Sequence, residues 1–120
     1  MESHTHPNGK IVNIEYLKKL SKGNNRFVEE MIRIFLTENP EEIKKLEKAI
    51  SEKDFDMIRA TTHKLKATLP YLGLDKIVNE EIAEVENLAF EKKEIEKIER
   101  LFYKIKEICE RARRELQTAA

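Results

Sequence analysis

The chain has 120 residues, a length that suits one domain with a single modest core. Its 23 basic and 23 acidic residues cancel, which argues against a general nucleic-acid binder because such proteins usually carry a basic excess. No apolar run is long enough to span a bilayer, and no signal peptide is visible. Glu, Lys, Leu and Ile dominate, with three glycines and no tryptophan, which predicts an all-α protein.

The single cysteine, Cys109, cannot form an internal disulfide, so we expect a reducing, cytoplasmic location. Cys109 falls within an apolar stripe and is interpreted as a core residue rather than a nucleophile. Residues 1–12 are expected to form a flexible lead-in, because residues 1–10 are polar and contain the breaker cluster Pro7, Asn8 and Gly9. Its two histidines, His4 and His6, are too few for a metal site, and we expect no bound metal.

Capping residues divide the first half of the chain into three predicted helices. A short helix covers 14–20 and ends at Gly23, and a second covers 24–39 with Asn24 or Asn25 as its cap. The run Asn39–Pro40–Glu41–Glu42 then predicts a new helix over 40–52, with the asparagine as N-cap, the proline as first residue and Glu42 as the capping-box partner.

The second half contains three longer amphipathic segments. Asp54 is expected to cap a helix over 55–72 that Gly73 ends, and Asp75 to cap a helix over 76–89. The last helix is predicted over 93–115. Short connections favour antiparallel neighbours, so residues 13–117 are expected to form one up-and-down four-helix bundle. Its main helices are 24–39, 55–72, 76–89 and 93–115, with 14–20 and 40–52 as additional short helices.

The helix over 55–72 carries the one candidate site. Each residue turns about 100° around a helix, and on that scale His63 lies well away from the inward stripe. That stripe consists of Ile58, Thr62, Leu65, Leu69 and Leu72. The imidazole is therefore expected to be exposed, with Lys66 at i+3 and Arg59 at i−4 on the same side.

An exposed imidazole is a good nucleophile near neutral pH, because much of it is unprotonated. If His63 carried a phosphoryl group, Lys66 and then Arg59 would be the best-placed cations to meet its charge. Ala67 at i+4 would leave room for another protein to approach. The alternative stays open, since an exposed histidine between lysines often has no function.

The stretch His63–Leu74, which reads HKLKATLPYLGL, resembles the phospho-acceptor motif of histidine phosphotransfer (HPt) domains. That motif reads roughly His-x-Leu-Lys-Gly-Ser/Ala and ends in a Gly-Leu or Gly-Ala pair. The upstream segments also look like the family's usual lead-in. They are Tyr16–Leu17, 23–27 and the turn from Phe35–Leu36 to Pro40.

The resemblance implies a bundle with no enzyme activity of its own, in which His63 accepts a phosphoryl group and Lys66 stabilises it. The donor would be the aspartate of a receiver domain, often in a hybrid sensor kinase, and the target the aspartate of a response regulator. Magnesium would belong to the receiver, so the chain would need no cofactor. We expect a monomer whose partners are receivers, not nucleic acid or membrane.

The sequence departs from the family pattern at two places. Ala67 stands where the motif usually has glycine, and Pro70 falls inside the predicted helix. Proline removes a backbone donor and clashes with the carbonyl of Lys66, so we expect a kink just beyond the histidine. The supporting or docking residues are predicted to be Arg59, Lys64, Ala67, Pro70 and Gly73.

Other features leave alternatives open. The apolar arc of the second helix, from Phe27 and Ile34 to Leu36, spans about 200°, which suits either burial between two neighbours or an exposed edge for a receiver. The acidic run over 80–86 and the charged region 91–100 are interpreted as solvated faces. An alternative function is a silent helical module that docks a receiver or kinase without phosphotransfer.

Overall fold

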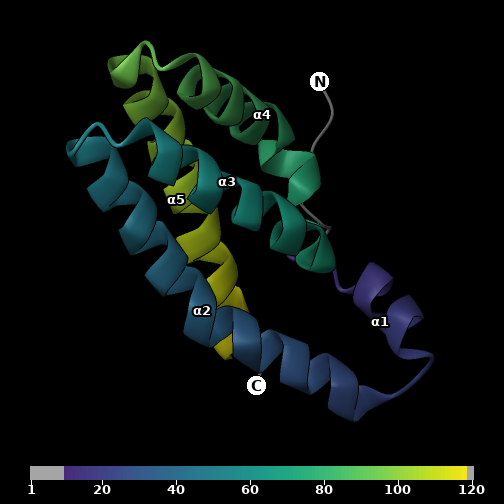
Figure 1. Cartoon of the computed structure of the whole chain (residues 1–120). Helices are drawn as coiled ribbons and strands as arrows, with labels where there is room; N and C mark the ends of the chain where they lie inside the picture. Colours follow the sequence, from purple (N-terminus) through teal and green to yellow (C-terminus); the bar gives the residue numbers. More distant parts are fainter. Residues whose placement is uncertain (1–9, 119–120) are drawn as a thin grey trace.

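The computed structural model describes residues 10–118, and their regular structure is entirely helical, which confirms the predicted fold class (Figure 1). Four long helices pack as a bundle, with α2 against α3, α3 against α4, α4 against α5 and α5 against α2. Within this range, no helix combines the length and apolar character needed to cross a bilayer. The elements are α1 Glu15–Ser21, α2 Asn25–Ser51, α3 Phe55–Thr68, η1 Leu69–Leu72, α4 Asp75–Glu91 and α5 Ile95–Thr118.

The core lies along the bundle axis and takes one apolar stripe from each long helix. Thr62 is fully buried together with the apolar stripe of α3, as predicted. Burying one large aliphatic side chain stabilises a fold by roughly 1.5–3 kcal/mol, so these stripes hold the helices in place. Buried residues of the stripes include Ile43 and Leu46, Ile58 and Leu65, Val78, Ile82 and Val85, and Ile98, Phe102 and Ile105.

The predicted boundary between two helices at Asn39–Pro40 is wrong, because α2 continues through it. Asn39 does not cap a helix; it is 5% exposed, donates to Cys109 Sγ at 3.6 Å and accepts from Arg113 Nη1. Glu42 does not close a capping box either, and it accepts from Lys64 Nζ. A proline inside a helix costs about 3 kcal/mol. Buried contacts on both sides of Pro40 offset that cost.

The predicted helix over 55–72 is wrong in its last turn. α3 ends at Thr68 and the chain tightens into the 3₁₀ helix η1, which contains Pro70. Since Pro70 has no N–H to bond the carbonyl of Lys66, the change of winding occurs where the kink was expected. Gly73 ends η1 with φ +73°, as predicted.

Two of the four predicted helix N-caps are confirmed, and that of Asn39 is wrong because α2 continues through it. The side chains of Asn24 and Asp54 accept from the backbone N–H of Phe27 and Met57. The cap assigned to Asp75 is wrong, because Leu74 precedes α4 and Asp75 lies in its first turn. A carboxylate there still suits the positive end of the helix dipole.

Residues 1–9 of the predicted lead-in, with His4 and His6, lie outside the described residues. Its last part differs from the prediction, since Ile11 is 3% exposed. The backbone N–H groups of Ile11 and Val12 donate to the Glu115 carboxylate at 3.0 Å. The segment before α1 is therefore attached to α5 by hydrogen bonds. The helix α1 itself packs against α2 and η1.

Candidate functional site

His63 lies in the middle of α3, and its side chain is 74% exposed. The buried stripe of α3 turns Ile58, Thr62 and Leu65 inward and leaves the imidazole in solvent. The exposure predicted from the helical angles is confirmed. α3 is a regular α-helix around His63, because the change to 3₁₀ winding begins only at Leu69.

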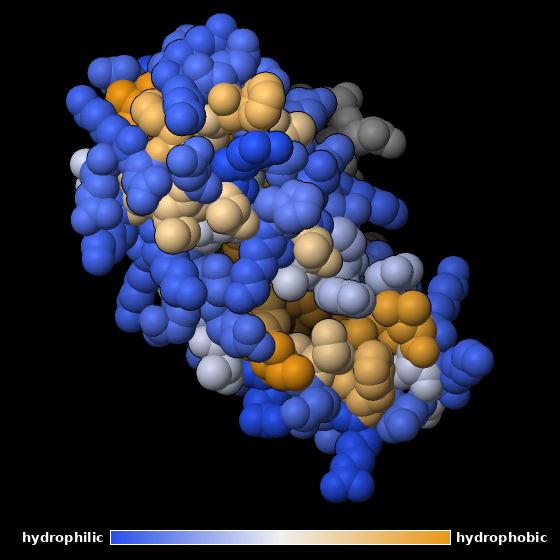
Figure 2. Space-filling view, viewed as in Figure 1, coloured by the Kyte–Doolittle hydropathy of each residue, from blue (hydrophilic) through white to orange (hydrophobic). Residues whose placement is uncertain are grey.

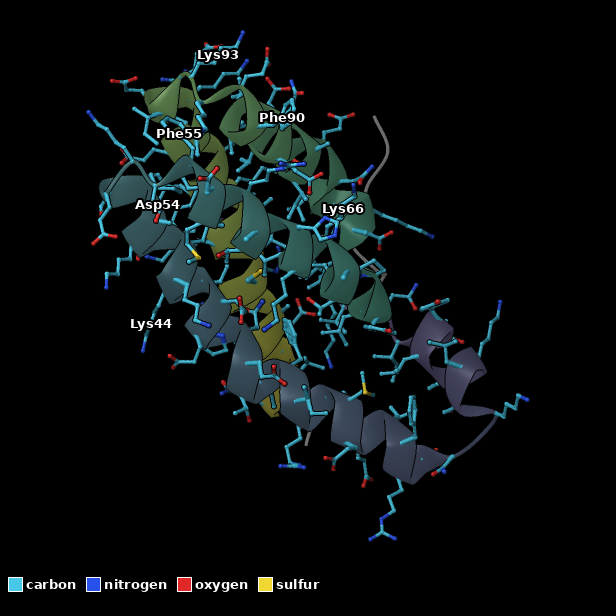
Figure 3. All side chains as sticks on the ribbon, in the orientation of Figure 1. Lys44, Asp54, Phe55, Lys66, Phe90 and Lys93 are labelled. Atoms are coloured by element: carbon cyan, nitrogen blue, oxygen red, sulfur yellow. The ribbon has the colours of Figure 1, made fainter. Side chains whose placement is uncertain are left out.

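A carboxylate from the neighbouring helix contacts both His63 and Lys66. Glu86 of α4 places Oε2 3.4 Å from His63 Nδ1 and Oε1 3.6 Å from Lys66 Nζ. Figure 3 shows Lys66 on the side of α3 that borders α4. The Glu86 side chain is 24% exposed, so the interpretation of the whole run 80–86 as a solvated face is wrong at this residue.

The position of Glu86 bears on which imidazole nitrogen carries the proton. Its Oε2 atom is buried and has no hydrogen-bond donor within residues 10–118. The 3.4 Å contact is longer than the roughly 2.7–2.9 Å of a charge-assisted hydrogen bond, so a small movement would close it. A carboxylate beside Nδ1 favours the proton on that atom. The lone pair of Nε2 is then available for attack.

Lys64 is directed away from this cluster. Its Nζ atom lies 2.8 Å from Glu42 Oε1, and the hydrogen bond and charge of Glu42 raise the pKa of Lys64. Lys64 therefore joins α3 to α2 and leaves Lys66 as the lysine on the histidine side. The prediction that Lys64 supports the site is not tested by this contact.

The other predicted supporting residues fall into two groups. Arg59, one turn before His63, places its guanidinium carbon 4.7 Å from the centroid of the Phe90 ring, and Ala67 is exposed one turn after it. Pro70 and Gly73 lie at the end of the helix. A Cβ atom on Gly73 would come within 2.9 Å of Asn13 Cβ, so this glycine has a packing role.

A small apolar groove lies on the opposite side of α3 from Glu86, with a volume of about 90 Å³. Figure 2 shows apolar side chains around a hollow over α1 and the nearby half of α2. Met31, Ile34 and Phe35 of α2 line this groove, whereas Ile32 and Leu36 face the segment before α1. The wide apolar arc of α2 therefore divides between two neighbours, and its groove edge stays partly open.

The remaining candidate nucleophile is inert. Cys109 is fully buried, and burial raises the pKa of its thiol to about 11. Within residues 10–118, no three or more His, Cys, Asp or Glu side chains gather to hold a metal ion. Neither Cys109 nor a metal cluster among the described residues competes with His63 as the candidate site.

Glu86 is the residue that sequence reasoning missed. It follows Val85 at the edge of the α4 stripe and looks like one of several surface acids. One signal was available: His63 lies ten residues before Gly73 and Glu86 thirteen after it. In an antiparallel helix pair joined at that glycine, the two side chains fall at a similar height.

Comparison with protein families finds a match over most of the chain. The family model described as Hpt domain matches residues 30–115, which is more than half of the chain. The matched range begins inside α2 and includes α3, with His63, and α4, with Glu86. The searches of curated proteins and of solved structures found no match.

Proposed function

The chain belongs to the Hpt domain family, whose members carry phosphoryl groups in two-component phosphorelays, and we propose that His63 is the residue that carries the group here. The observation that supports this assignment is the exposed imidazole with a carboxylate at Nδ1. With the proton held at Nδ1, the Nε2 lone pair of this exposed side chain would be the one that attacks a phosphorylated partner.

In the proposed transfer, the Nε2 lone pair of His63 attacks the phosphorus of an aspartyl phosphate on a receiver domain. The new N–P bond forms as the P–O bond to the aspartate breaks, and the bonding pair leaves with the carboxylate. The ring then holds a positive charge until the Nδ1 proton is lost. Glu86 stabilises that charge, and it favours the reverse step in the same way.

Lys66 is proposed to neutralise the phosphoryl group from its position one turn along α3. It is held near the imidazole by Glu86, at 3.6 Å from Oε1. The magnesium ion that phosphoryl transfer uses would come with the receiver, so the chain itself would bind no cofactor. On this proposal the chain is a carrier and not an independent enzyme.

The proposed partners are the receiver of a hybrid sensor kinase and that of a response regulator, in the cytoplasm. The partly open edge of the apolar groove lined by Met31, Ile34 and Phe35 lies beside α3 and offers an apolar surface to these receivers. We propose that the chain acts as a monomer, with neither nucleic acid nor membrane as a partner.

The test is phosphoryl uptake from a panel of phosphorylated receivers, with the modified residue mapped by mass spectrometry. We expect label on His63 in the wild type and none in His63→Gln, with unchanged helical circular dichroism. The matched control is His4→Gln combined with His6→Gln, which removes the other two histidines and should leave uptake unchanged.

Label on another residue, or no label from any receiver, would contradict the acceptor assignment. If receivers bind the wild type and His63→Gln equally well but transfer nothing, the chain is the silent docking module considered above. Binding by isothermal titration, run beside the labelling, separates these two results.

A further inference from the structure

Phe90 of α4 is the most exposed large apolar residue within residues 10–118, at 63%. The guanidinium of Arg59 lies over its ring at 4.7 Å, within the range of a cation–π contact. Figure 3 shows Phe90 and Lys66 on the same side of the α3–α4 pair. Arg59 precedes His63 by four residues, and Phe90 follows Glu86 by four, so this contact lies one helical turn from the acceptor.

The cations around His63 differ in what holds them. Lys66 contacts the carboxylate of Glu86 at 3.6 Å, and Lys64 contacts that of Glu42 at 2.8 Å. Each lysine therefore already faces a negative charge. Arg59 contacts an uncharged ring, which holds the guanidinium without neutralising it.

A phosphoryl group would add a charge of about −1.5 to −2 at pH 7. Next to His63, the pair of Lys66 and Glu86 contributes almost no net positive charge to meet it. A guanidinium one turn away can reach the new oxygens, because side chains at i and i+4 of a helix are neighbours. Its planar set of donors also suits phosphate oxygens better than an ammonium does.

We propose that Arg59 is a stored second cation, which leaves Phe90 and binds the phosphoryl group once it is on His63. This inference rests on the proposed function, and it makes Phe90 a positioning residue. The aromatic ring holds Arg59 near the acceptor and competes with the phosphoryl group for it. Exposure of the ring is required, since a buried ring could not release the guanidinium to the surface.

The experiment uses full chains that carry His4→Gln and His6→Gln, so that His63 is the remaining histidine. Phosphoramidate phosphorylates the imidazole without a protein partner. The pKa of the attached phosphoryl group is then measured by phosphorus NMR titration. The variants are Arg59→Gln, Phe90→Leu and both together, with Arg100→Gln, an exposed arginine of α5, as the matched control.

A nearby cation lowers the pKa of a phosphoryl group because it stabilises the dianion. Removing Arg59 should raise this pKa by roughly 0.5, about a threefold change in Ka for one charge at this separation in water. Phe90→Leu should lower it slightly, since releasing the guanidinium from the ring favours the phosphoryl contact by about two- to fivefold. Without Arg59, Phe90→Leu should have no effect.

Three results would overturn the inference. Arg59→Gln could match the Arg100→Gln control, Phe90→Leu could act equally with and without Arg59, or phosphoramidate could fail to label His63. The first two results do not bear on phosphoryl uptake from receivers, so they refute the stored cation without refuting His63 as the acceptor. Conversely, a chain that takes no phosphate from receivers but shows the Arg59 coupling refutes only the proposed function.

Discussion

Glu86 lies beside His63 at the contact between α4 and α3, with 3.4 Å between its Oε2 atom and the imidazole Nδ1. The same carboxylate reaches Lys66 through its other oxygen. One acidic side chain thus faces the proposed acceptor and its stabilising cation together. The arrangement lets Glu86 influence both the tautomer of the ring and the position of the lysine.

Replacing this carboxylate by an amide should slow phosphoryl uptake. We expect Glu86→Gln to reduce the rate from a phosphorylated receiver by about three- to tenfold, because the charge that forms on the ring loses its partner. Nitrogen NMR of His63 should also show less protonation at Nδ1. Glu84→Gln is the matched control, since Glu84 contacts Lys97 and not the histidine. A wild-type rate in Glu86→Gln would contradict this role.

The contact between Lys64 and Glu42 predicts a pH dependence of stability. The hydrogen bond raises the pKa of Lys64 above its ordinary 10.5, so the folded state holds this proton more tightly than the unfolded state. The stabilisation is therefore complete below pH 10.5 and is lost as the pH rises through the raised value.

Urea unfolding of the wild type and Lys64→Met should show this loss directly. The difference in unfolding free energy between the two should be constant near neutral pH and should shrink as the pH rises above 10.5. Lys44→Met is the control, because Lys44 is 74% exposed and faces Glu41 at 3.8 Å. A difference that stays constant through this range would show that the Glu42 contact does not hold the proton.

Gly23 and Gly73, the glycines with positive φ among the described residues, should differ in their tolerance of alanine. Gly73→Ala meets both a left-handed backbone and a Cβ contact of 2.9 Å with Asn13, and should lose about 2–4 kcal/mol. Gly23→Ala has a φ of +85° but nothing within 4 Å, and should lose only about 1–2 kcal/mol. Equal losses in thermal or urea unfolding would mean that Asn13 moves aside at little cost.

Pro40 offers a test of the continuous α2 helix. Because it lies in the helix interior, Pro40→Ala should restore a backbone donor and stabilise the protein by about 1–2 kcal/mol in urea unfolding. Pro70→Ala, at the start of η1 where proline fits, should change stability by less than about 1 kcal/mol. Had Pro40 opened a new helix, its replacement would be neutral or harmful, and that result would contradict the fold described here.

Periodicity and capping chemistry were enough to predict the bundle. The positions of Asn24, Asp54 and Gly73 mark real helix ends, and the stripe through Thr62 is buried as expected. The same local rules failed at Asn39–Pro40. A capping preference of about 1 kcal/mol cannot compete with buried contacts made by Arg113 and Cys109 from a helix some seventy residues away.

The sequence by itself determined that His63 faces solvent, because the turn of a helix places each residue relative to its own stripe. Its local motif also carried the family resemblance. Only the tertiary structure decided which side chains surround the imidazole: Glu86 against Nδ1, Lys64 drawn to Glu42, and Arg59 held on Phe90. Those partners come from α2 and α4, and their distances depend on helix packing, which no pattern within α3 encodes.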